Sequence, residues 1–119
     1  MILDNGDVIL INHRRMFESD TNRTFVGVVD GYEGGVVKVT GYTWCRNHFG
    51  GAYQKKEEKR TKIFSISSGL YIIYQLPDAL DVEKLYINQT KRGESILTDG
   101  QEFSMDLSES VTAPDGHKA

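Results

Sequence analysis

The feature that most constrains the fold is a run of β-forming residues interrupted by glycines, FVGVVDGYEGGVVKVTGYTW, at residues 25–44. Valine and aromatic residues, which favour strands, dominate this run, and five glycines divide it. Gly34 and Gly35 can adopt the positive φ angles that a tight two-residue hairpin turn requires. The run therefore predicts two neighbouring antiparallel strands joined at these two glycines.

The other glycines of the run are interpreted as bend points in a strongly coiled strand pair. With Gly34-Gly35 as the loop, Gly27 is expected opposite Tyr42 and Phe25 opposite Trp44. An aromatic ring that covers a cross-strand glycine keeps a strand intact while letting it curve. The same register puts four valines on one face, Val26, Val28, Val37 and Val39. It puts Phe25, Gly27, Val29 and Gly31 on the other face, together with Tyr42 and Trp44.

The rest of the chain is also typical of short strands separated by turns. Further strands are expected at residues 8–12, 63–67, 70–76, 85–90, 94–98 and 102–107. A long solvated loop is expected over 45–62, and one helical turn within 78–85. Seven or more short strands without a long helix predict an all-β fold, a small strongly bent β-barrel with an appended β-meander. Residues 1–107 are expected to form this single domain, and residues 108–119 a disordered tail.

Part of the hairpin resembles the first signature of the Sm/LSm family, in which apolar residues alternate with glycines before an aromatic and an acidic residue. The matching positions are Phe25, Gly27, Val29, Gly31, Tyr32 and Glu33. The family's second signature, an Arg-Gly turn followed by apolar residues, corresponds to Ser68-Gly69 followed by Leu70, Ile72 and Ile73. The resemblance covers about residues 7–76, and it implies a small SH3-like barrel that assembles through strand edges.

Three departures from the family pattern bear on function. Glu33 stands where the family has Asp, and Ser68 stands where it has Arg. The Asn expected shortly after the first signature is absent. In the family these side chains hold a base and its phosphate, and nothing here replaces the bidentate donor geometry of an Arg. The resemblance therefore implies the fold and edge assembly without implying RNA binding.

Composition narrows the classes of function and the cellular setting that remain. The chain of 119 residues has a formal net charge of −3, which argues against nucleic acid as the main partner. A single cysteine, Cys45, excludes an intrachain disulfide and favours a cytoplasmic setting. No apolar stretch approaches the ~18 residues that a membrane span needs, and the first residues lack a signal-peptide pattern. We therefore expect a cytoplasmic protein that is not associated with a membrane.

No residue set predicts catalysis, a metal site or a cofactor. Cys45 and His48 have a workable spacing for metal, and His13 adds a third group, but a structural zinc site requires four ligands. A Cys45–His48 nucleophilic pair would need a stabilised thiolate and an oxyanion site, and no motif surrounds it. The expectation is a non-enzymatic protein without metal or cofactor.

One group of basic and aromatic residues forms the candidate binding surface: Arg14, Arg15, Arg23, Lys38, Tyr42 and Trp44. Exposed aromatics can stack on bases, whereas charges along a strand can also simply guard an edge against pairing. The favoured hypothesis is a non-catalytic binding or assembly module that uses a strand edge or an aromatic surface, with self-association or a protein as partner. The alternative is an Sm-like oligomeric protein that binds RNA or another single-stranded nucleic acid.

Overall fold

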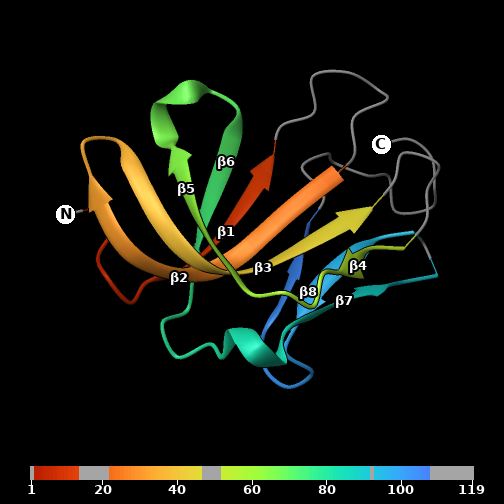
Figure 1. Cartoon of the computed structure of the whole chain (residues 1–119). Coiled ribbons are helices and arrows are strands. Elements are labelled where there is room, and N and C mark those ends of the chain that lie inside the picture. Colours follow the sequence, from red (N-terminus) through yellow and green to blue (C-terminus); the bar gives the residue numbers. More distant parts are fainter. Residues whose placement is uncertain (1, 14–21, 47–51, 92, 108–119) are drawn as a thin grey trace. The chain divides into compact units, whose positions relative to one another are not determined.

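The computed structural model describes residues 2–13, 22–46, 52–91 and 93–107. Within these residues the fold is all-β, with two antiparallel sheets (Figure 1). The strands are β1 (Val8–His13), β2 (Asn22–Glu33), β3 (Val36–Arg46), β4 (Gln54–Lys55), β5 (Arg60–Ser65), β6 (Tyr71–Leu76), β7 (Tyr86–Gln89), β8 (Ser95–Thr98) and β9 (Ser104–Asp106). Two 3-10 turns accompany them, η1 (Ile66–Ser68) and η2 (Val82–Lys84).

The chain separates into two compact units, residues 1–83 and residues 84–119. The first unit holds a sheet in the order β4-β3-β2-β1-β6, with β5 also paired to β3. The second unit holds the three-stranded sheet β7-β8-β9, which confirms the expected meander. The expectation of one domain over 1–107 stays a prediction, because each unit is described by itself. The expected tail, 108–119, lies outside the described residues.

The hairpin predicted at residues 25–44 is confirmed. β2 and β3 pair along their length and meet at Gly34 and Gly35, whose φ angles are 57° and 81°. The predicted register is right from the turn to Gly31 and wrong beyond it, because a β-bulge between Val29 and Gly31 shifts the pairing by one residue. The extra residue is Asp30, whose carboxylate accepts a hydrogen bond from the Thr40 hydroxyl.

The bulge pairs glycine with glycine. Gly27 lies opposite Gly41 and not opposite Tyr42. A Cβ on Gly41 would lie 2.5 Å from Gly27 Cα, and a Cβ on Gly27 would lie 2.7 Å from the Thr40 carbonyl carbon. These glycines therefore let two backbones approach closely, instead of being covered by aromatic rings as predicted.

The same shift corrects the predicted faces. Val39 lies directly opposite Val29, so it shares a face with Val29 rather than with Val28. Tyr42 lies opposite Val26, and thus on the face that the prediction gave to the valines. A one-residue slip moves side chains to the other face because the strand period is two.

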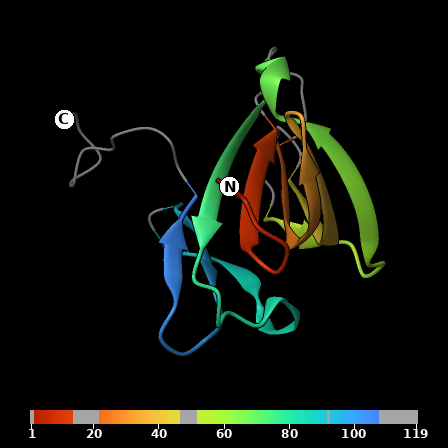
Figure 2. The same cartoon turned by 90° about the vertical axis from the view of Figure 1, so that its left-hand side faces the viewer.

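The hydrophobic cluster of the first unit gathers on one face of its sheet, although Val8, Leu10, Val26 and Trp44 on the other face are buried as well. The cluster comprises Leu3, Ile9, Ile11, Phe25, Val29, Val37, Val39 and Phe64, with Tyr32, Ile66, Tyr71 and Ile73 packed at its margin. β5 and β6 lie at opposite ends of the strand order, yet the rings of Phe64 and Tyr71 are 5.1 Å apart in a T-shaped contact. The sheet therefore curls, and Figure 2 shows β5 and β6 converging towards η1.

Backbone pairing does not complete this curl in the described residues. β5 pairs with β3 and β6 pairs with β1, and no pairing joins β5 to β6. The two strands are connected through η1 and Gly69, whose φ of 78° fits the predicted turn. The all-β character is confirmed, whereas the small, strongly bent barrel stays a prediction.

Three smaller expectations also have outcomes. The loop expected over 45–62 is shorter than predicted, because β4 and the start of β5 lie within it. The helical turn expected within 78–85 is η2. Along 102–107, Phe103, Met105 and Leu107 are more buried than the residues between them, as the alternation predicts.

Candidate functional site

The residues of the predicted binding surface differ in their exposure, and two of them are not described. Arg14 and Arg15 lie outside the described residues. Arg23 on β2 and Lys38 on β3 are exposed, whereas Tyr42 is half-buried and Trp44 is only 1% exposed. Trp44 therefore offers no open ring face on which a base could stack.

The cation that meets these two aromatic rings is Lys55 from β4, a residue that the sequence interpretation placed in a loop. Lys55 Nζ lies 4.1 Å from the centroid of the Tyr42 ring and 5.5 Å from that of Trp44. Lys55 is also the direct strand partner of Trp44. A lysine over an aromatic face is a favourable contact, so this cluster stabilises the β3–β4 edge.

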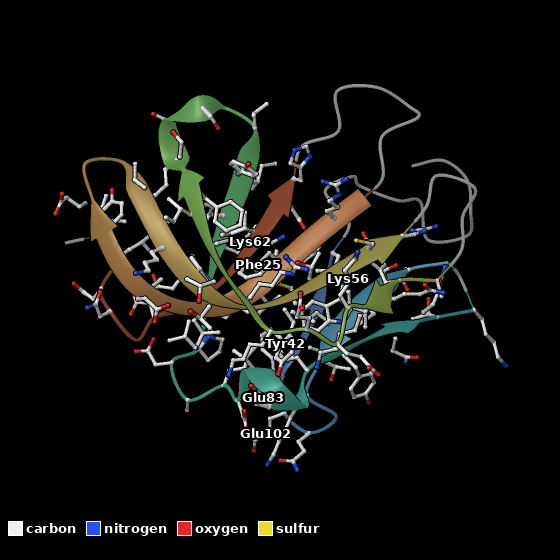
Figure 3. All side chains as sticks on the ribbon, viewed as in Figure 1. Phe25, Tyr42, Lys56, Lys62, Glu83 and Glu102 are labelled. Atoms are coloured by element: carbon white, nitrogen blue, oxygen red, sulfur yellow. The ribbon has the colours of Figure 1, made fainter. Side chains whose placement is uncertain are left out.

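Tyr42 is further engaged by Glu83 of η2 (Figure 3). The Tyr42 hydroxyl donates to Glu83 Oε1 at 2.6 Å, and Lys59 Nζ donates to Glu83 Oε2 at 2.9 Å. These hydrogen bonds lower the pKa of Glu83, and the bond to Glu83 raises the pKa of Tyr42. The carboxylate is thus compensated from both sides, which makes this cluster a link between η2 and β3.

A cavity of about 330 Å³ lies on the core side of the curled sheet. Residues of β1, β2, β3, β5 and β6 line it: Ile11, His13, Arg23, Thr24, Phe25, Thr43, Lys62, Ile63, Phe64 and Tyr71. We call this cavity the end-strand pocket, because it includes residues of both end strands, β5 and β6. Arg23 is a member of the predicted surface that lines it.

Aromatic rings form a continuous wall of the end-strand pocket. The Phe25 and Phe64 centroids are 5.6 Å apart, and Phe64 and Tyr71 follow at 5.1 Å. The His13 ring meets Tyr71 edge-on at 5.5 Å. None of these four rings belongs to the predicted binding surface.

The main charged group of the pocket is Lys62, which lies beside Phe25 (Figure 3). Its Nζ donates to Thr43 Oγ1 at 3.1 Å and lies 5.0 Å from the Phe25 ring centroid. Partial burial lowers the pKa of Lys62, and the nearby cations Arg60, Arg23 and Lys56 lower it further. None of the described residues that line the pocket is acidic.

Lys62 was not identified from the sequence because it was assigned to the charged loop KKEEKR and its flank. The two-residue alternation of side chains along a strand could have identified Lys62. Phe64 is buried, so residue 62 must point to the same face as Phe64 if β5 begins before it. The end-strand pocket as a whole could not be found in this way, because it depends on the curl that brings β5 and β6 together.

The residues considered for metal do not form a site in the described part of the chain. Cys45 is half-buried in β3, and His13 lines the end-strand pocket. His48 lies outside the described residues. No group of three or more His, Cys, Asp or Glu side chains suited to a metal ion occurs among those that are described. The helical turns seen in the described ranges are also too short to cross a membrane.

Comparison with known proteins found no match to this chain among protein-family models, curated proteins or solved structures.

Proposed function

We propose that this chain is a non-catalytic assembly module that pairs with a second copy of itself through the outer edge of β6. The observation that carries the proposal is the contrast between the two end strands of the first sheet. Both keep one edge without a strand partner in the described residues, but only one of them carries charges along its length.

β6 reads YIIYQL and has no charged residue, whereas β5 reads RTKIFS and has Arg60 and Lys62. Natural proteins commonly protect free edges with charged residues, above all lysine, because an unprotected edge is a template for pairing. β5 is protected in this way and β6 is not. Free edges of this kind recognise other strands by main-chain hydrogen bonds.

A second copy is the partner that fits β6 best. Two antiparallel β6 strands would bring no like charges together, and a two-fold contact uses the same surface on both subunits. Ile72, which is 40% exposed, would gain apolar cover on the outer face of such a joined sheet. Leu70, 37% exposed just before β6, would add to it.

We also infer that the first unit belongs to the small, strongly bent barrels of the Sm-like or SH3-like kind. Support comes from the Phe64–Tyr71 contact, which joins the end strands by side chains where backbone pairing is absent. Nucleic-acid binding is less well supported. Trp44 is buried and the Tyr42 hydroxyl is held by Glu83, so the predicted stacking residues are engaged.

Light scattering of the full chain tests the assembly proposal. The expected mass is that of a dimer, and Ile72→Lys is expected to reduce it to that of a monomer by placing two like charges at the junction. Ile63→Lys is the matched control, since Ile63 is an exposed isoleucine on the other end strand. It is expected to leave the dimer intact.

Two results would overturn the proposal. One is a monomeric mass for the natural chain at every concentration reached. The other is dissociation by Ile63→Lys with none by Ile72→Lys, because the pairing edge would then be β5. Circular dichroism of both variants verifies that each is folded.

A further inference from the structure

We propose that the end-strand pocket binds a small organic monoanion, a carboxylate attached to an aromatic or branched apolar body. This inference goes beyond the assembly proposal and does not depend on it. Tyr71 of β6 lines the pocket, but Ile72, the residue changed to test assembly, does not, whereas Lys62, the residue changed to test this proposal, does. The two proposals can therefore fail separately.

The charges of the end-strand pocket favour an anion. Lys62 and Arg23 line the pocket, and none of the described lining residues is acidic. An ammonium carries three donors, and Thr43 Oγ1 accepts one from Lys62. The chain as a whole carries a net charge of −3, so this concentration of positive charge is a local feature. A carboxylate could accept the remaining donors and neutralise the charge.

The walls favour an apolar body on that anion. Phe25 and Phe64 are buried aromatic residues that also belong to the core, and Ile11 adds an aliphatic surface. Ile63, at the margin of the pocket, is 69% exposed. An apolar group in the pocket would pack against the rings and remove part of Ile63 from water. The volume of about 330 Å³ lies near the lower end of the range for small-ligand sites.

The number and depth of the cations favour a single negative charge. Lys62 is the partly buried cation, whereas Arg23 is exposed. Moving a charge away from water is costly unless it is paired, so a doubly charged phosphate would need a second inward cation. A carboxylate matches the one ammonium on the inner wall. Thr24 Oγ1 is already committed to Asn12 Oδ1 at 2.8 Å. Arg23, His13 and Tyr71 offer further donors, and Lys62 is the partly buried cation among the lining residues.

The same chemistry has two sources. A free small carboxylate carries it, and so does the C-terminal carboxylate of a protein chain that ends in an apolar residue. Both present one negative charge next to an apolar group. The experiment therefore includes one probe of each kind.

The test is a titration of the ¹⁵N-labelled full chain, followed by amide chemical shifts. The free probe is 3-phenylpropanoate, and its matched controls are 3-phenylpropylamine and 3-phenylpropanol, which share the ring and differ in charge. Saturable shifts are expected at residues that line the end-strand pocket with the carboxylate alone. The second source is probed with N-acetyl-glycyl-phenylalanine and its C-terminal amide.

Two variants assign the carboxylate to Lys62. Lys62→Met should weaken binding about tenfold or more, since hydrogen bonds to charged groups are worth more than neutral ones. Lys62→Arg should retain most of it. Lys38→Met, which removes the same charge from an exposed position outside the pocket, should leave affinity unchanged.

The results separate the outcomes. Saturable binding of either carboxylate that Lys62→Met weakens and Lys38→Met does not supports the proposal, and the stronger of the two probes identifies the source. Binding of the amine or the alcohol as tightly as the acid overturns it, as does equal loss in both methionine variants. An absence of saturable shifts with both carboxylates in the folded natural chain also overturns it.

Discussion

Two sides of the first sheet are held in different ways. Between β2 and β3, two backbones approach so closely that only glycine fits at residues 27 and 41. Between β5 and β6, no backbone pairing is present in the described residues, and the rings of Phe64 and Tyr71 make the contact. The close approach on one side bends the sheet, and the bend brings the other two strands together without joining them. The end-strand pocket results from this incomplete closure.

The largest expected loss of stability comes from a substitution at the close approach between β2 and β3. Gly41→Ala should destabilise the chain by about 3 kcal/mol or more, because the new Cβ would overlap the backbone of β2 and the strands would have to separate. Chemical denaturation measures the change. Gly31→Ala is the matched control in the same hairpin: nothing lies within 4 Å of its Cβ, and it should be close to neutral. Equal effects of both substitutions would contradict the close-approach explanation.

A smaller loss is expected on the side held by aromatic rings. Phe64→Ala should cost about 3 kcal/mol, at the lower end for a buried phenylalanine, because the cavity that it leaves opens into the end-strand pocket. Ile63→Ala next to it should stay within about 0.5 kcal/mol, since Ile63 is largely exposed. The same denaturation experiment measures both. A neutral Phe64→Ala would show that the rings do not hold this side.

The sequence predicts the turn and the strands of the hairpin better than it predicts the curvature of the sheet. Gly34 and Gly35 indicate the turn, and alternating apolar residues indicate the strands on either side of it. No such sequence pattern marks the bulge at Asp30. One extra residue in a strand leaves the strand propensity of its neighbours unchanged, but it shifts every cross-strand pair beyond it by one residue. Trp44 and Tyr42 were therefore assigned to the wrong face.

The site was predicted less well than the fold, for a related reason. Phe25 is far along the chain from Lys62 and Tyr71, and the curl brings all three to one pocket. Residue types alone indicated that basic and aromatic side chains would meet. They could not indicate which ones, because that depends on register, on curvature and on a strand, β5, that begins inside an expected loop.

Lys62→Met should leave the melting temperature unchanged or raise it at neutral pH. Because partial burial and nearby cations lower the pKa of Lys62 in the folded chain, the unfolded chain binds more protons in the alkaline range. The cost of the charged lysine is therefore present at neutral pH and relieved as pH rises towards its unfolded pKa, about 10.4. Thermal melts of the natural chain and the variant should converge at alkaline pH. A marked loss of stability at neutral pH would mean that Lys62 is instead a stabilising charge.

The smallest effect is expected at Glu83, where the charges are already matched. Hydrogen bonds from Tyr42 and Lys59 lower the pKa of Glu83, so its contribution to stability is present above its unfolded pKa and is lost as pH falls through the folded one. Glu83 and Lys59 are exposed and Tyr42 is half-buried, and exposed ion pairs contribute little. Glu83→Gln should therefore lower the melting temperature slightly at neutral pH and not at all in strong acid. Glu83→Gln and Lys62→Met should thus differ in their effect on the melting temperature at neutral pH, because Lys59 pairs with a carboxylate whereas Lys62 donates to a hydroxyl. A Glu83→Gln effect that is as large in strong acid as at neutral pH would show that the side chain acts through packing and not through its charge.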